Sequence, residues 1–191
     1  MNRLTTFAVA GAAALTLAFA ATAPAPSFAK EMTKMVGGAA MYPSKNIVQN
    51  AMNSKDHTTL VAAVKAAGLV PTLESKGPFT VFAPTNEAFK KLPEGTVQTL
   101  LKPENKDKLK SILTYHVVSG RLTAKDLMEK VKAGGGKAEI KTVEGAPLTV
   151  EEKDGKLWLI DAKGDKAEVT IANVMQSNGV IHVINTVMLP G

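Results

Sequence analysis

The thirteen residues Gly77 to Phe89, GPFTVFAPTNEAF, contain a strand and a helix in immediate succession. The run from Phe79 to Ala83 alternates β-branched and aromatic side chains between two faces, which predicts a strand that is apolar on both sides. Pro78 and Pro84 bracket this run, and proline fits strand ends better than a ladder interior because it lacks an N–H group. We therefore expect a short, buried strand here.

A helix is expected directly after this strand. Thr85 and Asn86 offer side-chain oxygens to the free N–H groups of its first turn. Phe89 and Leu92 lie three residues apart, so both side chains can face back onto the strand. A buried strand that feeds a docked helix is a nucleus for the core. The residues that we assign to this structural signature are Thr80, Phe82, Pro84, Thr85, Asn86 and Phe89.

These residues closely resemble the first signature box of the fasciclin domain, whose usual form is a TVFAPTxxAF run. Asn178 to Pro190, NGVIHVINTVMLP, resembles the second box, and Tyr115-His116 resembles the Tyr-His pair in the centre of the family's sequence. The three matches occur in the expected order, so the resemblance covers about Ile47 to Pro190. It implies an α+β fold, a wedge-shaped antiparallel β-sandwich or sheet with an N-terminal cluster of short α-helices. The second box adds two residues to the structural signature, Gly179 and His182.

The first 29 residues have the pattern of an export signal. A weakly basic start is followed by apolar residues 7–21 and by the small-x-small cleavage site Ser27-Phe28-Ala29. The apolar run is too short for a membrane anchor and is followed by prolines. We expect cleavage before Lys30, which gives a secreted, extracellular or periplasmic protein with no integral membrane segment.

The rest of the chain is expected to form one domain preceded by a short arm. Residues 30–44 are rich in Met, Gly and Ala and predict a flexible arm, whereas residues 45–191 predict a single fasciclin-like domain. The chain contains no cysteine, which excludes disulfides, thiol nucleophiles and thiolate metal sites. Thioether sulfur is a soft ligand for Cu(I), so the arm's methionines are a candidate copper site. The favoured alternative is opportunistic packing, because no His or Cys accompanies Met32, Met35 and Met41.

Apolar spacing divides the domain into a helical first part and an alternating second part. Helices are expected at Asn46–Met52, within residues 56–68 and 93–118, and at Arg121–Lys132, where Thr123 is the expected cap. Tyr115 to Val118 is expected to leave the third of these as an extended segment.

Alternation begins at Ala138 and continues to the end of the chain. The last apolar run places large side chains on both of its faces, which is typical of a central strand covered on both sides. The expected strands are Ala138–Val143, Leu148–Glu152, Leu157–Ile160, Glu168–Met175 and Val180–Leu189.

The formal net charge of +6 comes almost entirely from lysine, because Arg121 is the only arginine after residue 29. Lysine lacks the planar fork that reads bases and grips phosphates, and no aromatic residues are interleaved with the lysines to stack bases. We therefore expect no nucleic-acid partner. Attraction to an acidic glycan or to the cell envelope is compatible with this charge, although a solvated face is the default for such lysines.

The sequence contains no contiguous catalytic motif. GxSxG, HExxH, GxGxxG after a strand and a phosphate-binding loop are all absent. His57, His116 and His182 fall in three different contexts, and His116 and His182 are expected to be buried residues with hydrogen-bond partners. We expect no catalytic residues, no metal site and no cofactor, and hence no enzyme.

The expected function is that of an exported, non-catalytic binding module that mediates cell adhesion or contact with a surface or matrix. Its expected partner is a cell-surface or matrix protein or an acidic glycan. The resemblance implies that the neighbourhood of Tyr115 and His116 meets receptors. Animal members carry an Asp-Ile pair ahead of the second box, where this chain has Asn173-Val174, and the missing carboxylate argues against metal-assisted recognition. The candidate binding residues are Tyr115, His116, Asn173 and Val174.

Two other classes of function remain open from the sequence. The first is a periplasmic ligand-binding or stress-related protein, with copper handled by the N-terminal methionines. The second is an immunogenic secreted antigen without a dedicated partner, as the resemblance to some bacterial members implies.

Overall fold

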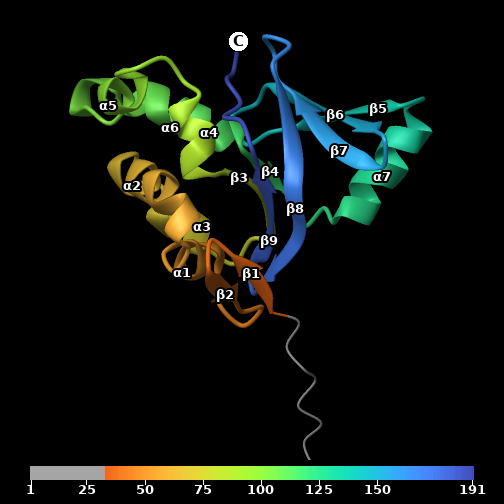
Figure 1. Ribbon diagram of the computed structural model, residues 1–191, viewed down its shortest axis with the longest axis horizontal. Coiled ribbons are helices and arrows are strands. Elements are labelled where there is room, and N and C mark those ends of the chain that lie inside the picture. Colours follow the sequence, from red (N-terminus) through yellow and green to blue (C-terminus); the bar gives the residue numbers. More distant parts are fainter. Residues whose placement is uncertain (1–32) are drawn as a thin grey trace, which may run out of the picture. The chain divides into compact units, whose positions relative to one another are not determined.

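The computed structural model describes residues 33–191, which form helices on one side of a large sheet and a further helix on the other (Figure 1). The α-helices are α1 (Ile47–Ala51), α2 (Thr58–Ala66), α3 (Val70–Glu74), α4 (Asn86–Lys90), α5 (Thr96–Leu100), α6 (Lys106–Tyr115) and α7 (Ala124–Ala133). The 3₁₀ turns are η1 (Lys55–His57) and η2 (Pro103–Asn105). The strands are β1 (Lys34–Val36), β2 (Ala39–Met41), β3 (Phe79–Pro84), β4 (Val117–Ser119), β5 (Lys137–Lys141), β6 (Pro147–Lys153), β7 (Lys156–Ile160), β8 (Lys166–Gln176) and β9 (Gly179–Ile184).

Strands β3 to β9 form one sheet in the order β4-β3-β9-β8-β7-β6-β5. Neighbouring strands of this sheet pair antiparallel, except for β3 and β9, which run parallel to each other. Their register extends from the pair Phe79 and Gly179 to the pair Pro84 and Ile184. The expected α+β fold is therefore confirmed, and the antiparallel sheet is correct except at its centre. The two segments that carry the signature boxes lie side by side in that centre.

Gly179 is required by the close approach of β9 to β3. A Cβ atom at this position would lie 2.1 Å from the carbonyl oxygen of Phe79, far closer than real contacts allow. Any side chain would therefore push the two central strands apart at the first pair of their register.

Strands β3 and β9 separate two apolar cores. Val81 and Ile181 face the core shared with the helices α1 to α6. Phe82 and Ile184, on the opposite face, belong to the core shared with α7 and strands β5 to β8. Figure 1 shows α1 to α6 on one side of these strands and α7 on the other. The two-sided apolar character expected of both strands is confirmed, and burial on both faces lets each strand contribute to both cores.

The last strand is shorter than its apolar pattern suggests. We expected it to continue to Leu189, but β9 ends at Ile184. Near the end of the chain, backbone N–H groups donate to side chains instead of to a neighbouring strand. The Met188 N–H donates to His116 Nε2 at 3.0 Å, and the Leu189 N–H donates to Asp161 Oδ2 at 2.9 Å.

The Tyr-His pair also differs from the expected extended segment. Tyr115 is the last residue of α6, and His116 caps it in the right-handed helical conformation. The His116 N–H donates to the Leu113 carbonyl at 3.2 Å, which keeps the pair in the last helical turn. Extended structure begins only at Val117.

The expected flexible arm is wrong for residues 34–41, which form the hairpin β1–β2. Gly37 and Gly38 both adopt positive φ values, as a two-residue turn of this kind requires. Val36 and Met41 are buried in the core with α1 and α2. The Met-, Gly- and Ala-rich composition concealed this hairpin, because its strands are only three residues long.

The expected export signal, residues 1–29, and Met32 lie outside the described residues. Within residues 33–191, the structure contains no helix that is both long and apolar enough to cross a membrane.

Candidate functional site

Tyr115 and His116 lie at the corner where α6 meets β4, and both side chains are buried. Tyr115 is fully enclosed in the core with α7, and its hydroxyl donates to the Pro147 carbonyl at 2.8 Å. His116 bonds through both ring nitrogens, Nδ1 to the Ile112 carbonyl at 2.8 Å and Nε2 to the Met188 N–H at 3.0 Å. This partner set requires the neutral tautomer with the proton on Nδ1.

Burial lowers the pKa of His116 from its ordinary value of 6.5 to about 4, although the Ile112 carbonyl and the Asp161 carboxylate act in the opposite direction. The neutral ring can therefore accept from Met188 throughout the physiological pH range. His116 joins the end of α6 to the segment after β9, which is the structural role expected of a buried histidine.

Asn173 and Val174 lie at an irregularity in β8, where the register with β9 shifts between Ile171 and Val174. Asn173 adopts a left-handed conformation with φ 57°, and its Oδ1 accepts from the Ala124 N–H at 2.7 Å. Val174 is buried in the core with the N-terminal helices. Asn173 thus satisfies the first N–H of α7, next to the cap that Thr123 supplies.

His182 connects these groups across the sheet. Its Nε2 bonds to the Leu122 carbonyl at 2.8 Å, and its Nδ1 accepts from the Asn173 N–H at 3.4 Å. The ring stacks on Phe82 at 5.6 Å between centroids, and the Phe82 N–H in turn donates to the His116 carbonyl at 2.9 Å. Burial lowers the pKa of His182, so this ring is also neutral.

The structure therefore brings His116, Asn173 and His182 into one internal network and places Tyr115 and Val174 in the cores beside it. All of these side chains except that of Asn173, which is half-buried, are buried. None of the buried ones presents a surface that a macromolecular partner can reach. Their geometry supports a structural role more strongly than the binding role that the resemblance implies.

We predict that Asn173→Ala lowers the free energy of unfolding by about 2 kcal/mol. Alanine removes the acceptor for α7 and strains the left-handed backbone, and each effect is worth roughly 1 kcal/mol. Asn173→Gly should recover about half of this loss, because glycine tolerates the backbone but supplies no oxygen. Urea denaturation of the three proteins measures both steps. Equal losses for the two variants would show that the backbone conformation contributes nothing.

Thr85 and Asn86 were both expected to cap α4, but only Thr85 does so, since its Oγ1 accepts from the Ala88 N–H at 3.2 Å. Asn86 instead caps α2. Its Oδ1 accepts from the Thr59 N–H at 3.0 Å, and its Nδ2 donates to the Lys55 carbonyl at 2.9 Å. The first signature box thereby fastens α2 and η1 to the strand β3.

Two residues that the sequence did not single out hold distant segments together. Asn178 is buried before β9 and bonds to three backbone groups on α1, on α3 and just after α3. Asp161 is buried after β7 and accepts from the N–H groups of Lys163, Asp165 and Leu189, each at 2.9 Å. An Asn-Gly pair and an Asp in a loop both resemble ordinary turn residues, so local sequence carries no signal of these long-range bonds.

Within residues 33–191, no group of three or more His, Asp or Glu side chains is placed to hold a metal ion.

The family model of the Fasciclin domain matches residues 55–190. Protein sll1483 of Synechocystis sp. is 51% identical over 160 residues, which cover 84% of this chain and 82% of that protein. Immunogenic protein MPB70 of Mycobacterium bovis is 34% identical over 199 residues, which cover 97% of this chain and 94% of that protein. Both relatives are matched over most of their own length.

Two further matches involve larger proteins. Transforming growth factor-beta-induced protein ig-h3 of Sus scrofa is 40% identical over 131 residues, which are 69% of this chain but only 17% of that protein. The solved structure of a FAS1 domain pair from the insect cell adhesion molecule Fasciclin I superposes with a TM-score of 0.70 at 22% identity. It covers 78% of this chain, which spans about half (52%) of that structure. The family model covers residues 55–190 and two relatives are matched over most of their own length, so this chain belongs to the fasciclin domain family.

Proposed function

We propose that this protein is an exported, non-catalytic binding module that mediates adhesion to an acidic component of a cell surface or matrix. The observation that carries the proposal is the fasciclin domain over residues 55–190, together with the solved neighbour that comes from an insect cell adhesion molecule. Because Tyr115, His116 and Val174 are buried, we place the binding surface among the exposed charged residues.

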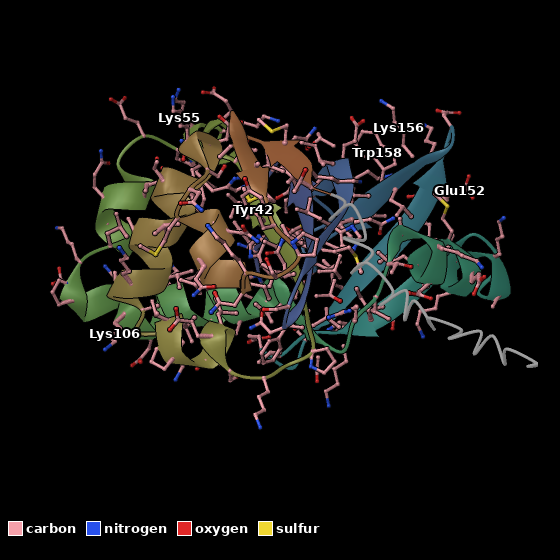
Figure 2. All side chains as sticks on the ribbon, turned by 90° about the horizontal axis from the view of Figure 1, so that it is seen from below. Tyr42, Lys55, Lys106, Glu152, Lys156 and Trp158 are labelled. Atoms are coloured by element: carbon pink, nitrogen blue, oxygen red, sulfur yellow. The ribbon has the colours of Figure 1, made fainter. Side chains whose placement is uncertain are left out.

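We define the basic patch as Lys65 on α2 with Lys106 and Lys110 on α6. All three side chains are exposed and none takes part in the ion pairs found among residues 33–191. Lys106 and Lys110 are four residues apart, so they share one face of α6. The ammonium group of Lys106 lies beside Gly68, three residues after Lys65, which connects the two helices. Figure 2 shows Lys106 at the outer edge of the helical part of the protein.

Lys106 lies between the ends of two helices. It is the first residue of α6, where the partial positive charge of the helix end disfavours a cation. Its ammonium group lies beside Gly68, just after the end of α2, where the helix carbonyl groups carry the opposite partial charge. Three cations without ion-pair partners on two helices that contact each other suit an anionic partner, such as a sulfated or carboxylated glycan.

We predict that the triple variant Lys65→Gln, Lys106→Gln, Lys110→Gln binds a sulfated glycan on the order of 100-fold more weakly than the wild type. This magnitude follows if each lysine contributes about 1 kcal/mol, as basic residues do at an anionic surface. Binding should be measured with the labelled protein on the glycan and on intact cells of its source, at low and high salt. Saturable binding that survives high salt would indicate a defined site.

A matched control variant loses the same number of positive charges outside the basic patch. Lys141→Gln, Lys153→Gln and Lys163→Gln remove three exposed lysines from the strand-rich part of the chain. This control should bind like the wild type at high salt. Equal weakening in both triple variants would reduce the binding to general charge attraction, and absence of any binding to cells or glycan would contradict the adhesion proposal.

The structure lends no support to the copper alternative. Met35 is 63% exposed on the hairpin β1–β2, whereas Met41 is 3% exposed and packs into the core. Their side chains therefore lie on opposite faces of the hairpin and cannot meet at one ion while the hairpin is folded.

A further inference from the structure

Strand β7 carries the only tryptophan of the chain, Trp158. Its neighbours Leu157 and Leu159 are buried in the core with α7, so the side chain of Trp158 lies on the opposite face of the sheet. Trp158 is half-buried, and it belongs to neither of the two apolar cores found among residues 33–191. Part of the indole is therefore reached by solvent. Figure 2 shows Trp158 and Lys156 on the same side of the strand-rich part of the protein.

A carboxylate side chain lies on each side of this tryptophan. Glu151 of β6 and Glu168 of β8 are the residues directly opposite Trp158 in the register of the sheet. Cross-strand neighbours of this kind have Cβ atoms about 4.5–5.5 Å apart, so both carboxylate side chains leave the sheet next to the indole.

Two ion pairs hold these carboxylates in place. Lys156 Nζ lies 2.6 Å from Glu168 Oε1. Lys166 Nζ lies 3.1 Å from Glu151 Oε2, and this second pair spans β7, because β7 separates β6 from β8. The hydrogen bond from Lys166 lowers the pKa of Glu151, so this carboxylate is ionised at neutral pH. Each lysine engages only one oxygen of its carboxylate, and the second oxygen is left to accept a hydrogen bond.

We propose that this surface binds a neutral polysaccharide whose sugar rings carry equatorial hydroxyl groups. The face of such a ring consists of C–H groups, which stack on an indole because the face of an aromatic ring carries partial negative charge. The hydroxyl groups at the edge of the sugar ring both donate and accept. The carboxylates beside the indole can accept from them, and the ammonium groups can donate to them. We call the surface the Trp158 platform and define it as Glu151, Lys156, Trp158, Lys166 and Glu168.

The charges of the Trp158 platform favour a neutral ligand. Its two lysines and two carboxylates cancel, and each of these charges already has a partner. An anionic chain would be repelled by both carboxylates at the place where its ring has to stack, whereas a neutral chain leaves both ion pairs intact. Lys137 and Lys153 add positive charge at the margin, opposite Glu151 and Lys156, so the test includes an anionic glycan as well.

The Trp158 platform is separate from the basic patch and does not depend on the adhesion proposal. It lies on strands β6 to β8, whereas the basic patch lies on helices α2 and α6. A neutral chain offers no charge to the basic patch, and its binding should not weaken with salt. A failure of either proposal therefore leaves the other standing.

The test is a titration of the tryptophan fluorescence of the wild-type protein, which reports this surface alone because Trp158 is the only tryptophan. Cellohexaose and xylohexaose are neutral, β-1,4-linked chains with equatorial hydroxyl groups. At least one of them should change the emission in a saturable way, equally at low and high salt. A sulfated hexasaccharide should leave the emission unchanged, because the basic patch contains no tryptophan.

Variants then assign the binding to the indole. Trp158→Ala should bind the active hexasaccharide about tenfold more weakly, as expected for the loss of one stacked ring. This variant has no tryptophan, so its affinity and that of the wild type are compared by titration calorimetry. The matched control is Tyr42→Ala, which removes an aromatic side chain that is 38% exposed outside the Trp158 platform. The control should bind like the wild type.

Three results would overturn the proposal. The first is the absence of a saturable change in emission with either neutral chain, and this result is independent of whether Trp158→Ala folds. The second is an equal affinity of Trp158→Ala and the wild type in calorimetry. The third is a change in emission with the sulfated chain alone, which would assign the surface to an anionic ligand.

Discussion

Replacement of Asn178 by alanine is expected to lower the free energy of unfolding by about 3 kcal/mol or more, a large part of the 5–15 kcal/mol typical of a domain. Asn178 Oδ1 accepts from the Ile47 N–H at 3.1 Å. Its Nδ2 donates to the carbonyls of Leu73 at 2.7 Å and Ser75 at 2.8 Å. Alanine leaves three backbone groups without a partner, of which those of Ile47 and Leu73 are buried, and each buried orphan costs roughly 1–3 kcal/mol.

Urea denaturation of Asn178→Ala and the wild type measures this loss. The matched control is Asn53→Ala, because Asn53 is exposed at the end of α1 and its side chain bonds to nothing. The control should change stability by less than about 0.5 kcal/mol. A loss below about 1 kcal/mol for Asn178→Ala would mean that water replaces its bonds and that Asn178 does not fasten the N-terminal helices to the sheet.

Asn178→Asp separates the donor role from the acceptor role. A carboxylate can still accept from Ile47, but it has no N–H group for Leu73 and Ser75 and brings negative charge toward their carbonyl oxygens. We therefore expect the Asp variant to be no more stable than the Ala variant at neutral pH, although it keeps the shape of asparagine.

The elements that the sequence predicted well are those whose signal is local. Alternation of apolar residues identified both faces of β3 and β9, because side-chain direction in a strand has a period of two. Thr123 and Thr85 were recognised as caps because the cap and the N–H that it satisfies lie within three residues of each other. The resemblance to the fasciclin domain then supplied the arrangement of these elements.

The features that the sequence did not reveal depend on partners far away in the chain. The parallel pairing of β3 with β9 has no local signal, since either direction fits two strands that are apolar on both faces. Asn86, Asn173 and Asn178 are residues typical of caps and turns, yet each bonds to a backbone group at least 27 residues away. A short polar side chain does not indicate whether its partner is a neighbour or a distant helix.

The same limit applies to the candidate site. The sequence brought Tyr115, His116, Asn173 and Val174 together by resemblance alone, and the structure shows that their polar groups are engaged inside the fold. His57 was noted only as a histidine without ligand neighbours. Its burial emerges only when the helices and the sheet are packed together.

The protein is expected to lose about 2 kcal/mol of stability between pH 7 and pH 4.5 through His116 alone. The pKa of this residue is about 4 in the folded protein and near 6.5 in the unfolded chain. Because the folded pKa is the lower one, the unfolded chain takes up the proton first, and the stabilisation is present in full only above about pH 6.5. It is lost progressively as the pH falls toward the folded pKa.

The two other buried histidines act in the same direction. Burial lowers the pKa of His57 and of His182 as well, so the unfolded chain binds more protons than the folded one throughout this pH window. Asp126 and Glu151 also have lowered pKa values, but their ordinary values of 3.8 and 4.5 place their effect at more acidic pH. The loss between pH 6.5 and 4.5 is therefore dominated by histidine.

His116→Leu isolates the contribution of this residue. The variant should be less stable than the wild type at pH 7, because the Met188 N–H and the Ile112 carbonyl lose their partner. Its stability should nevertheless depend less steeply on pH, by about one proton near pH 5, when urea denaturation is repeated from pH 7 to 4.5. An unchanged slope would mean that His116 is protonated in the folded protein, and that the bond to Met188 does not hold the end of the chain in place.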